Sequence, residues 1–320
     1  MLQQTLRDLD AAWKAHEESK TGMRNGAARV APPRFKSRKD TLQTARFTRS
    51  DRWSITSAGK LHLPKVGDLR VKWSRSLPSA ATSVTLIRER SGRYFVSFVV
   101  ETDPAADALP PVDGDQGVDL GLTRFAVLAD GSHIASPKYL RRAEKRLRKR
   151  QRSLSRKKEG SKNRDKARVR VARVHAEVAD ARRNFHHQWS HKLTSENQAV
   201  FTESLNVAGL ARTRLAKSVY DAGWAQFVTM LAYKAARRGR SFAQVDRYFA
   251  SSRICSVCGH HDGPKPLRVR TWTCPACHTR HDRDWNAGRN VLHEGRRILG
   301  AATTAPSTPG PGAPARRRAG

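Results

Sequence analysis

Four cysteines constrain this chain more than any other feature, because they are all the cysteines it has and they come as two close pairs. Two residues separate Cys255 from Cys258 and Cys274 from Cys277, and a short apolar stretch typical of a strand precedes the second pair. Such spacing lets four thiolates close a tetrahedron around one zinc ion. The pattern therefore predicts a zinc ribbon in which these four cysteines bind Zn2+.

Two other uses of four cysteines have to be weighed. Two disulfides are disfavoured, because the sequence shows no signal peptide and its arginine-rich character is typical of a cytosolic protein. A rubredoxin-like iron site would use the same thiolates and stays open. Four thiolates leave no open position on the metal for water or substrate, so we expect a structural ion and seek the chemistry elsewhere.

The charge of the chain indicates the kind of partner. Its 62 Lys and Arg against 28 Asp and Glu give a formal net charge of +34. Charge of this size is typical of polyanion binders, and nucleic acid is the first candidate, although a solvated basic surface or a ribosome-associated protein would share it. No apolar run reaches the ~18 residues that cross a bilayer. We therefore expect no membrane partner and a cytoplasmic protein of bacterial type that acts on the nucleoid.

The first third of the chain predicts a helix followed by a β-rich region. Apolar residues at helical spacing predict an amphipathic helix over residues 1–20, with its polar side turned outward; they are Leu2, Leu6, Leu9 and Trp13. Glycine, proline and basic residues predict no packed element over residues 21–39. Short alternating runs between residues 44 and 101 predict strands, with a two-residue hairpin turn at Ser91-Gly92.

A segment rich in proline and aspartate places a domain boundary near residue 104. Two strands then follow, the first with Asp119 in its middle, and they lead into a basic helical pair over residues 138–190 with a loop around Gly160. Eleven of the eighteen residues from 141 to 158 are Lys or Arg. This density favours a helix laid against phosphates over an ordinary solvated face.

The second half of the chain alternates strands and helices. An apolar strand ends at Glu203, one helix is predicted over residues 218–239, and another strand over residues 241–249. A final helix is expected to begin near Asp284. The Pro, Ala and Gly tail of residues 301–320 is expected to be disordered.

Three carboxylates are candidates for catalysis. Two divalent cations can hydrolyse a phosphodiester, and hard cations prefer carboxylate oxygens from separate elements. Asp119 lies between apolar residues, where an unpaired carboxylate is costly; Glu203 ends a strand; and Asp284 begins a helix. Each alone could be a surface acid, a turn former or a helix cap, and Asp284 could be only an N-cap.

Five segments, taken in order, resemble one protein family. They are GVDLGLTRFAVLADG, FTESLNVAGL, ASSRICSVCG, WTCPACH and HDRDWNAGRNVL. The chain resembles the transposon-encoded TnpB/OrfB proteins, RNA-guided nucleases related to the type V CRISPR effectors. The cysteine spacing and RDWNAGRN make the resemblance specific, and it extends over roughly residues 1–300.

The resemblance implies an α/β fold of the α+β type, namely a ribonuclease H-like RuvC nuclease domain interrupted by a zinc ribbon. It implies a truncated β-rich and helical nucleic-acid-binding region over residues 1–104, since relatives begin with additional sequence. The nuclease domain would occupy residues 105–250, the zinc ribbon residues 251–280, and the last RuvC segment residues 281–300.

The same resemblance implies a function and its cofactors. Asp119, Glu203 and Asp284 would be the catalytic acids and the ligands of Mg2+, beside structural Zn2+. The partners would be a DNA target and a guide RNA from the transposon end. The alternatives are a catalytically silent RNA-guided regulator, a transposase-type strand-transfer enzyme, and a zinc-ribbon nucleic-acid adaptor.

Overall fold

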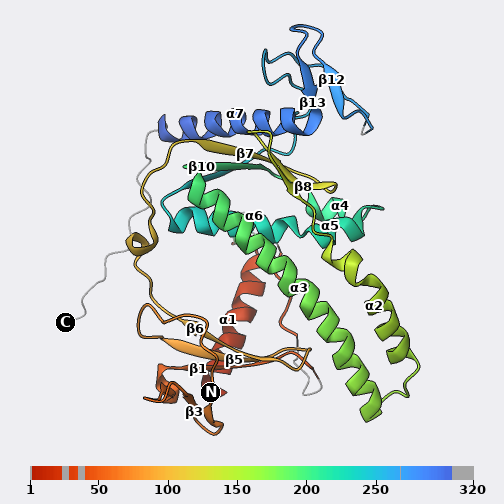
Figure 1. Ribbon diagram of the computed structural model, residues 1–320. Coiled ribbons are helices and arrows are strands. Elements are labelled where there is room, and N and C mark those ends of the chain that lie inside the picture. The colour runs from red at the N-terminus through yellow and green to blue at the C-terminus, as the bar shows by residue number, and fades with distance from the viewer. Residues whose placement is uncertain (1, 24–28, 35–39, 267, 305–320) are drawn as a thin grey trace, which may run out of the picture. The chain divides into compact units, whose positions relative to one another are not determined.

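The computed structural model describes residues 2–23, 29–34, 40–266 and 268–304, which form a mixed α/β fold (Figure 1). Two compact units divide the chain. The first comprises residues 1–106 and 145–177, and the second comprises residues 107–144 and 178–320. Each unit is described separately below.

The first unit contains two small antiparallel sheets. One has the order β1-β5-β6, with β1 at Gln43–Thr48, β5 at Ser83–Arg88 and β6 at Tyr94–Val99. The other runs β2-β3-β4, with β2 at Ser54–Ile55, β3 at Leu61–Leu63 and β4 at Gly67–Leu69. The core between these strands is formed by the buried side chains Phe47, Leu61, Leu63 and Val84. The predicted β-rich region is confirmed.

The hairpin between β5 and β6 differs from the prediction. Glu89 N–H donates to the Arg93 carbonyl at 2.9 Å, and Gly92 N–H donates to the Glu89 carbonyl at 2.9 Å. The loop therefore has three residues rather than two. Such loops end in a left-handed residue, and Gly92 supplies it with φ 81°.

Helix α1, at Leu2–Lys20, forms as predicted, but its apolar side is not covered. Leu6, Leu9 and Trp13 are 61%, 43% and 46% exposed. The expectation that this side packs inward is wrong, because β3 closes the core of the unit and α1 meets the sheet through an ion pair, Asp8 to Arg46 at 3.8 Å.

The second unit is built on a five-stranded sheet with the order β11-β10-β7-β8-β9. The strands are β7 at Asp115–Leu120, β8 at Arg124–Leu128, β9 at His133–Ala135, β10 at Ala199–Glu203 and β11 at Ser241–Val245. Strand β8 is antiparallel to both of its neighbours, β7 and β9, whereas β10 is parallel to both β7 and β11. Strand β11 ends at Val245 rather than at the predicted residue 249, because the side chain of Asp246 accepts a hydrogen bond from Tyr248 N–H and the chain turns there.

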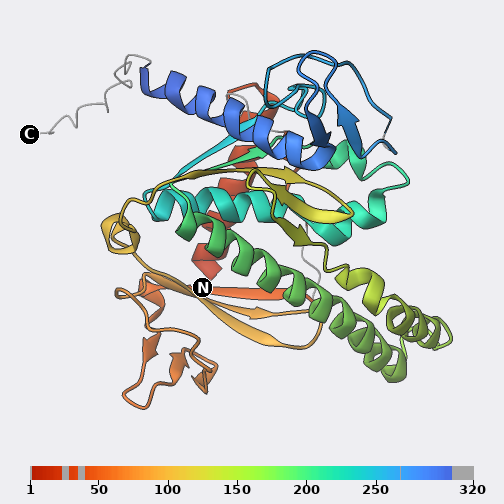
Figure 2. The ribbon, with the colours of Figure 1, turned by 45° about the horizontal axis from the view of Figure 1, so that its top comes forward.

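Helices cover both faces of this sheet (Figures 1 and 2). Helix α7, at Arg283–Thr304, packs on one face, while α6, at Trp224–Arg237, and the C-terminal part of α3 pack on the other. The approach of α7 is very close, since a Cβ built on Gly117 would lie 2.2 Å from the Gly288 carbonyl oxygen. Only glycine fits at position 117.

The remaining helices follow the predictions with one exception. The basic pair is α2, at Tyr139–Ser155, and α3, at Lys162–Glu196, with Gly160 left-handed in the loop. The helix predicted over residues 218–239 is instead two, α5 at Ala216–Ala222 and α6, because Gly223 adopts φ 65° between them. The other elements are α4 at Val207–Leu210, two 3-10 turns at Arg49–Asp51 and Pro104–Asp107, β12 at Thr271–Thr273 and β13 at Arg280–Asp282. Of the tail, residues 301–304 continue α7, and residues 305–320 lie outside the described part.

Candidate carboxylate site and cysteine cluster

The parallel strands β7 and β10 bring Asp119 level with Glu203. Their register pairs Gly117 with Phe201 and Val118 with Thr202, so Glu203 comes one step further, opposite Asp119. Gly117 and Phe201 both face α7, and residues two positions apart on a strand share a face. Asp119 and Glu203 therefore lie on the α7 face of neighbouring strands, which are about 4.8 Å apart.

Helix α7 brings the third carboxylate to the same place. Gly288 packs on Gly117, and Asp284 lies one helical turn before it, in the first turn of α7. The cap of this helix is Asp282, whose Oδ1 accepts the backbone N–H groups of Asp284 and Trp285 at 3.0 Å each. Since Asp282 takes that role, the carboxylate of Asp284 is not needed as an N-cap and is left for other contacts.

The electrostatics show that the three carboxylates interact. Burial, and then the negative charges of Glu203 and Asp284, raise the pKa of Asp119 well above its usual value, against the opposing effect of Arg283 and Arg270. Burial also raises the pKa of Glu203. Like charges held together in a half-buried site repel one another, and a bound cation would relieve this repulsion.

Two side chains that the sequence analysis did not single out contact these carboxylates. Ser251 Oγ donates to Glu203 Oε1, and Arg270 Nη1 lies 3.3 Å from Asp284 Oδ1. Arg270 directly precedes β12, and the pairing of β12 with β13 places it beside the start of α7, where its carbonyl accepts from Arg283 N–H at 2.8 Å. Ser251 lies within the quoted segment ASSRICSVCG, but nothing in that segment indicates its contact with Glu203, because only the tertiary fold brings it to β10.

Trp285 fixes the start of α7 against the β8–β9 turn. Its indole Nε1–H donates to the Ala129 carbonyl at 2.8 Å, and its ring lies 3.5 Å from the position of a Cβ on Gly131. Because Trp285 follows Asp284 directly, this contact also holds Asp284 in place.

The four cysteine sulfurs form a tight cluster. Cys255 Sγ lies 3.6 Å from Cys277 Sγ, and Cys258 Sγ lies 3.7 Å from Cys274 Sγ. A tetrahedral zinc site with Zn–S bonds of about 2.3 Å has sulfurs about 3.8 Å apart, whereas a disulfide needs about 2.05 Å. The spacing therefore fits one metal ion and not two disulfides, and the four sulfurs lie within 4.8 Å of one another.

A histidine and a threonine support this cluster from outside. His281 is 5% exposed, and its Nε2 lies 3.0 Å from Cys255 Sγ. A hydrogen bond joins Cys277 Sγ and Thr279 Oγ1 at 3.3 Å, and the hydrogen bonds with Thr279 lower the pKa of Cys277 to about 6. Hydrogen bonds of this kind orient metal ligands and stabilise the thiolate form.

The three carboxylates are set more widely than the sulfurs. A compact metal site brings three or more ligand atoms of Asp, Glu, His or Cys within 4.8 Å of one another. Among the residues that the structure describes, only the four cysteines meet this condition. The arrangement of the acids is thus more open than that of a closed structural site. An open arrangement suits cations that must also bind water and substrate.

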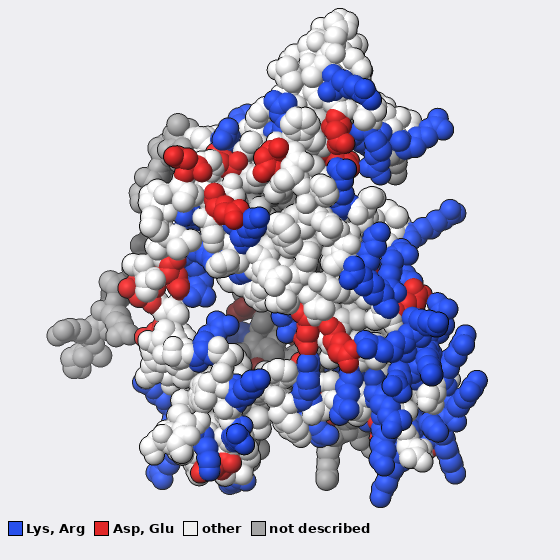
Figure 3. Space-filling model, in the orientation of Figure 1, with Lys and Arg blue, Asp and Glu red and all other residues white. Residues whose placement is uncertain are grey.

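Basic side chains gather over α2 and the adjoining end of α3 (Figure 3). A groove on α2 is lined by Lys145, Arg148, Lys149, Arg152, Arg156 and Lys157, together with Ser153. A second hollow lies between the β5–β6 hairpin and α3, and its basic residues are Arg88, Arg90, Lys166, Arg168, Arg170 and Arg173. Both surfaces fit the phosphates of a nucleic acid.

Comparison with known proteins identifies the family. The family model OrfB_IS605, described as "Probable transposase", matches residues 97–214, and the model described as "Cas12f1-like, TNB domain" matches residues 224–291. A protein of Streptomyces pristinaespiralis named "Putative RNA-guided DNA endonuclease" is 44% identical over 299 residues, which are 92% of this chain and 71% of the relative. The chain belongs to the TnpB/OrfB family. The resemblance found in its motifs is thereby confirmed.

Further relatives of this TnpB/OrfB chain are more distant. "Putative RNA-guided DNA endonuclease InsQ" of Escherichia coli (strain K12) is 27% identical over 316 residues, covering 93% of this chain and 75% of InsQ. Among solved structures, the protein of the Cas12f1–sgRNA–target DNA complex aligns with a TM-score of 0.50 at 14% identity, over 86% of this chain and 67% of the other. This likeness supports the mixed α/β fold. Among the described helices, none is long and apolar enough to cross a membrane.

Proposed function

We propose that this chain is an insertion-sequence-encoded, RNA-guided DNA endonuclease, with a DNA target and a guide RNA as its partners. The family and the names of its relatives support the activity. The convergence of Asp119, Glu203 and Asp284 from two strands and a helix is the observation that carries it, because metal-dependent phosphodiester hydrolysis needs such a cation site.

The architecture assigned to this activity is a ribonuclease H-like RuvC domain. An antiparallel run β7-β8-β9, continued by the parallel strands β10 and β11 and covered by α7, supports the assignment. The domain would span residues 105–250 and 281–300, with residues 251–280 as an inserted zinc ribbon and residues 1–104 as a nucleic-acid-binding region.

The donor sets fit the two metals differently. Four sulfurs at tetrahedral spacing fit Zn2+, which would stabilise the segment that leads into α7. Three oxygen donors with mutually repelling charges fit Mg2+. When bound there, Mg2+ ions supply an activated water and stabilise the leaving oxygen in phosphodiester hydrolysis.

The protein's own residues position the reacting groups. Asp119 lies on β7 one residue before its end, Glu203 ends the neighbouring strand β10, and the hydrogen bond from Ser251 sets the orientation of Glu203. Arg270 is 56% exposed at its side chain and pairs with Asp284. It is free to turn toward a phosphate oxygen of the scissile strand and offset its charge.

The basic surfaces would hold an RNA–DNA heteroduplex through its backbone. The α2 groove and the hollow beside the β5–β6 hairpin present cations without a pattern that could distinguish bases. RNA pairing would then supply sequence specificity while the protein binds the shape of the duplex.

The deciding experiment compares cleavage by the wild type, Asp119→Ala and Asp113→Ala. The chain is co-expressed with its flanking genomic DNA, so that any guide RNA is bound, and is supplied with Mg2+. Asp119→Ala should lose about a thousandfold or more in cleavage rate and keep its nucleic-acid binding, because several kcal/mol of transition-state stabilisation depend on the site. Asp113, an exposed linker acid, is the matched control and should cleave as the wild type does.

The outcomes also separate the alternatives. Retained cleavage in Asp119→Ala would overturn the site. Discrete bound RNA with no cleavage by any variant would favour a binding-only regulator, and joined rather than hydrolysed DNA ends would favour strand transfer.

A further inference from the structure

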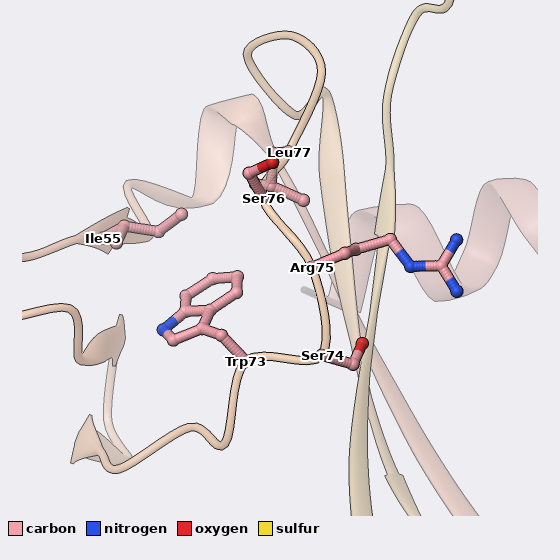
Figure 4. A pocket seen from close by; sticks show the side chains of 6 residues that line it. All are labelled: Ile55, Trp73, Ser74, Arg75, Ser76 and Leu77. Carbon is pink, nitrogen blue, oxygen red and sulfur yellow. The ribbon is translucent and has the colours of Figure 1, made fainter. Parts of the chain in front are cut away.

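A hollow in the first unit has a character different from the basic surfaces. It is lined by Ile55, Trp73, Ser74, Arg75, Ser76 and Leu77, and we call it the Trp73 pocket. Figure 4 shows Ile55, the indole of Trp73 and the Ser76–Leu77 segment around the hollow, while the guanidinium of Arg75 points away from the indole. The pocket therefore combines an apolar interior with a cation at its edge.

The indole of Trp73 is exposed and yet held in place. It is 37% exposed, and its ring stacks on Phe98 with centroids 5.3 Å apart and an interplanar angle of 19°. Its Nε1–H donates to the Gly59 carbonyl at 2.8 Å. Phe98 in turn packs against the core of the unit. A ring fixed by stacking beneath and by a hydrogen bond at its edge loses little freedom when a flat ligand binds on it.

The segment around Trp73 is basic and exposed. Arg70, Lys72 and Arg75 flank the tryptophan, and all three are exposed. None of the three forms an ion pair with a described residue, and no carboxylate lines the pocket. In contrast, Glu89 and Asp165 lie among the arginines of the hollow beside the β5–β6 hairpin.

We propose that the Trp73 pocket binds an unpaired base of a single-stranded nucleic acid, which stacks on the indole while Lys72 and Arg75 contact the flanking phosphates. An aromatic ring interleaved with cations is the arrangement that holds single strands, since every base has a π-face and every nucleotide a phosphate. Charge favours this occupant over an apolar protein segment, which would leave the cations without partners. The inference rests on the proposed function only in that the partner is a nucleic acid.

The test measures binding and needs no cleavage. The full chain, freed of RNA at high salt, is titrated without Mg2+ against a fluorescein-labelled 12-nucleotide single strand of RNA and against a blunt 12-base-pair RNA–DNA duplex. Trp73→Ala should bind the single strand about tenfold more weakly than the wild type and the duplex equally well. Trp73→Phe keeps a stacking ring and should stay within about threefold of the wild type. Trp13→Ala, at another exposed tryptophan, should change neither affinity.

Two results would overturn the proposal. One is unchanged binding of the single strand by Trp73→Ala, which would leave an apolar protein segment as the better occupant. The other is an equal loss of affinity for the single strand and for the duplex in Trp73→Ala, with Trp73→Phe binding as weakly as Trp73→Ala.

Photocrosslinking of the unaltered chain to a 5-iodouridine single strand covers the case in which Trp73→Ala does not fold. The crosslinked peptide should contain Trp73, and crosslinks confined to other peptides would contradict the proposal. Because both assays omit Mg2+, their outcome is independent of whether Asp119 supports cleavage.

Discussion

The cysteine cluster and the carboxylate site are assembled from the chain in opposite ways. The cysteines all lie within residues 255–277, and two tight turns and one short β-ladder bring their sulfurs together. The carboxylates come from β7, β10 and α7, and their meeting depends on the register of parallel strands and on a helix lying directly on the sheet. The first site is local, and the proposed zinc would hold it together. The second site is held by the fold itself.

Removal of zinc should produce the largest effect. Structural zinc sites contribute about 10 kcal/mol or more to folding, and this cluster has few apolar neighbours to replace that contribution. A strong chelator should abolish hydrogen-exchange protection in β12 and β13, and cleavage should fall because Asp284 lies two residues after the end of β13. The five-stranded sheet should keep its protection. An unchanged exchange pattern would contradict a structural metal.

Gly117→Ala should disrupt the carboxylate site by destabilising the packing of α7 on the sheet. The new Cβ would lie 2.2 Å from the Gly288 carbonyl oxygen and 2.6 Å from the Leu292 nitrogen, and backbone cannot move aside cheaply. We expect destabilisation of more than about 4 kcal/mol in denaturant unfolding. Gly300→Ala, in α7, is the control, because its new Cβ would meet open space and the change should be neutral or slightly stabilising. Equal stability of the two variants would show that α7 does not approach the sheet so closely.

Asp119→Asn should separate stability from activity. The pKa of Asp119 is raised in the folded state, so the folded protein binds more protons than the unfolded one and loses stability as the pH rises above the usual value of 3.8. Asparagine does not titrate. Without divalent cations the variant should therefore melt roughly 2–4 °C higher than the wild type at neutral pH, and the gap should close toward pH 4. A variant that melts lower at neutral pH would contradict the repulsion among the three carboxylates.

Trp285→Phe should have the smallest effect. It removes the hydrogen bond to the Ala129 carbonyl, which is worth about 1 kcal/mol, and leaves most of the ring packing. Cleavage should fall a few-fold through looser positioning of Asp284, with unchanged affinity for nucleic acid. Trp13→Phe should not change cleavage, and a similar loss there would mean that the effect is not local.

The same contrast explains how far the sequence could predict the molecule. The cysteine spacing predicted that the four sulfurs come together. The apolar runs predicted the strands that hold Asp119 and Glu203, and the last helix was expected to begin near Asp284, as α7 does. The backbone breaks were harder to predict, since Gly223 divides one periodic helix and Gly92 closes a three-residue loop only through their left-handed conformations. The contacts of Ser251 and Arg270, and the exposure of Leu6 and Leu9 on α1, depend on tertiary packing that no local pattern records.

The central claim is that Asp119, Glu203 and Asp284 form one cation site distinct from the zinc cluster. Anomalous diffraction from crystals of the zinc-loaded chain soaked in Mn2+ tests it most directly. We predict a zinc peak about 2.3 Å from the four sulfurs and a manganese peak bounded by the three carboxylates, absent from Asp119→Ala crystals. Manganese density absent from these carboxylates in the wild type, with the ion bound elsewhere on the chain, would contradict the account.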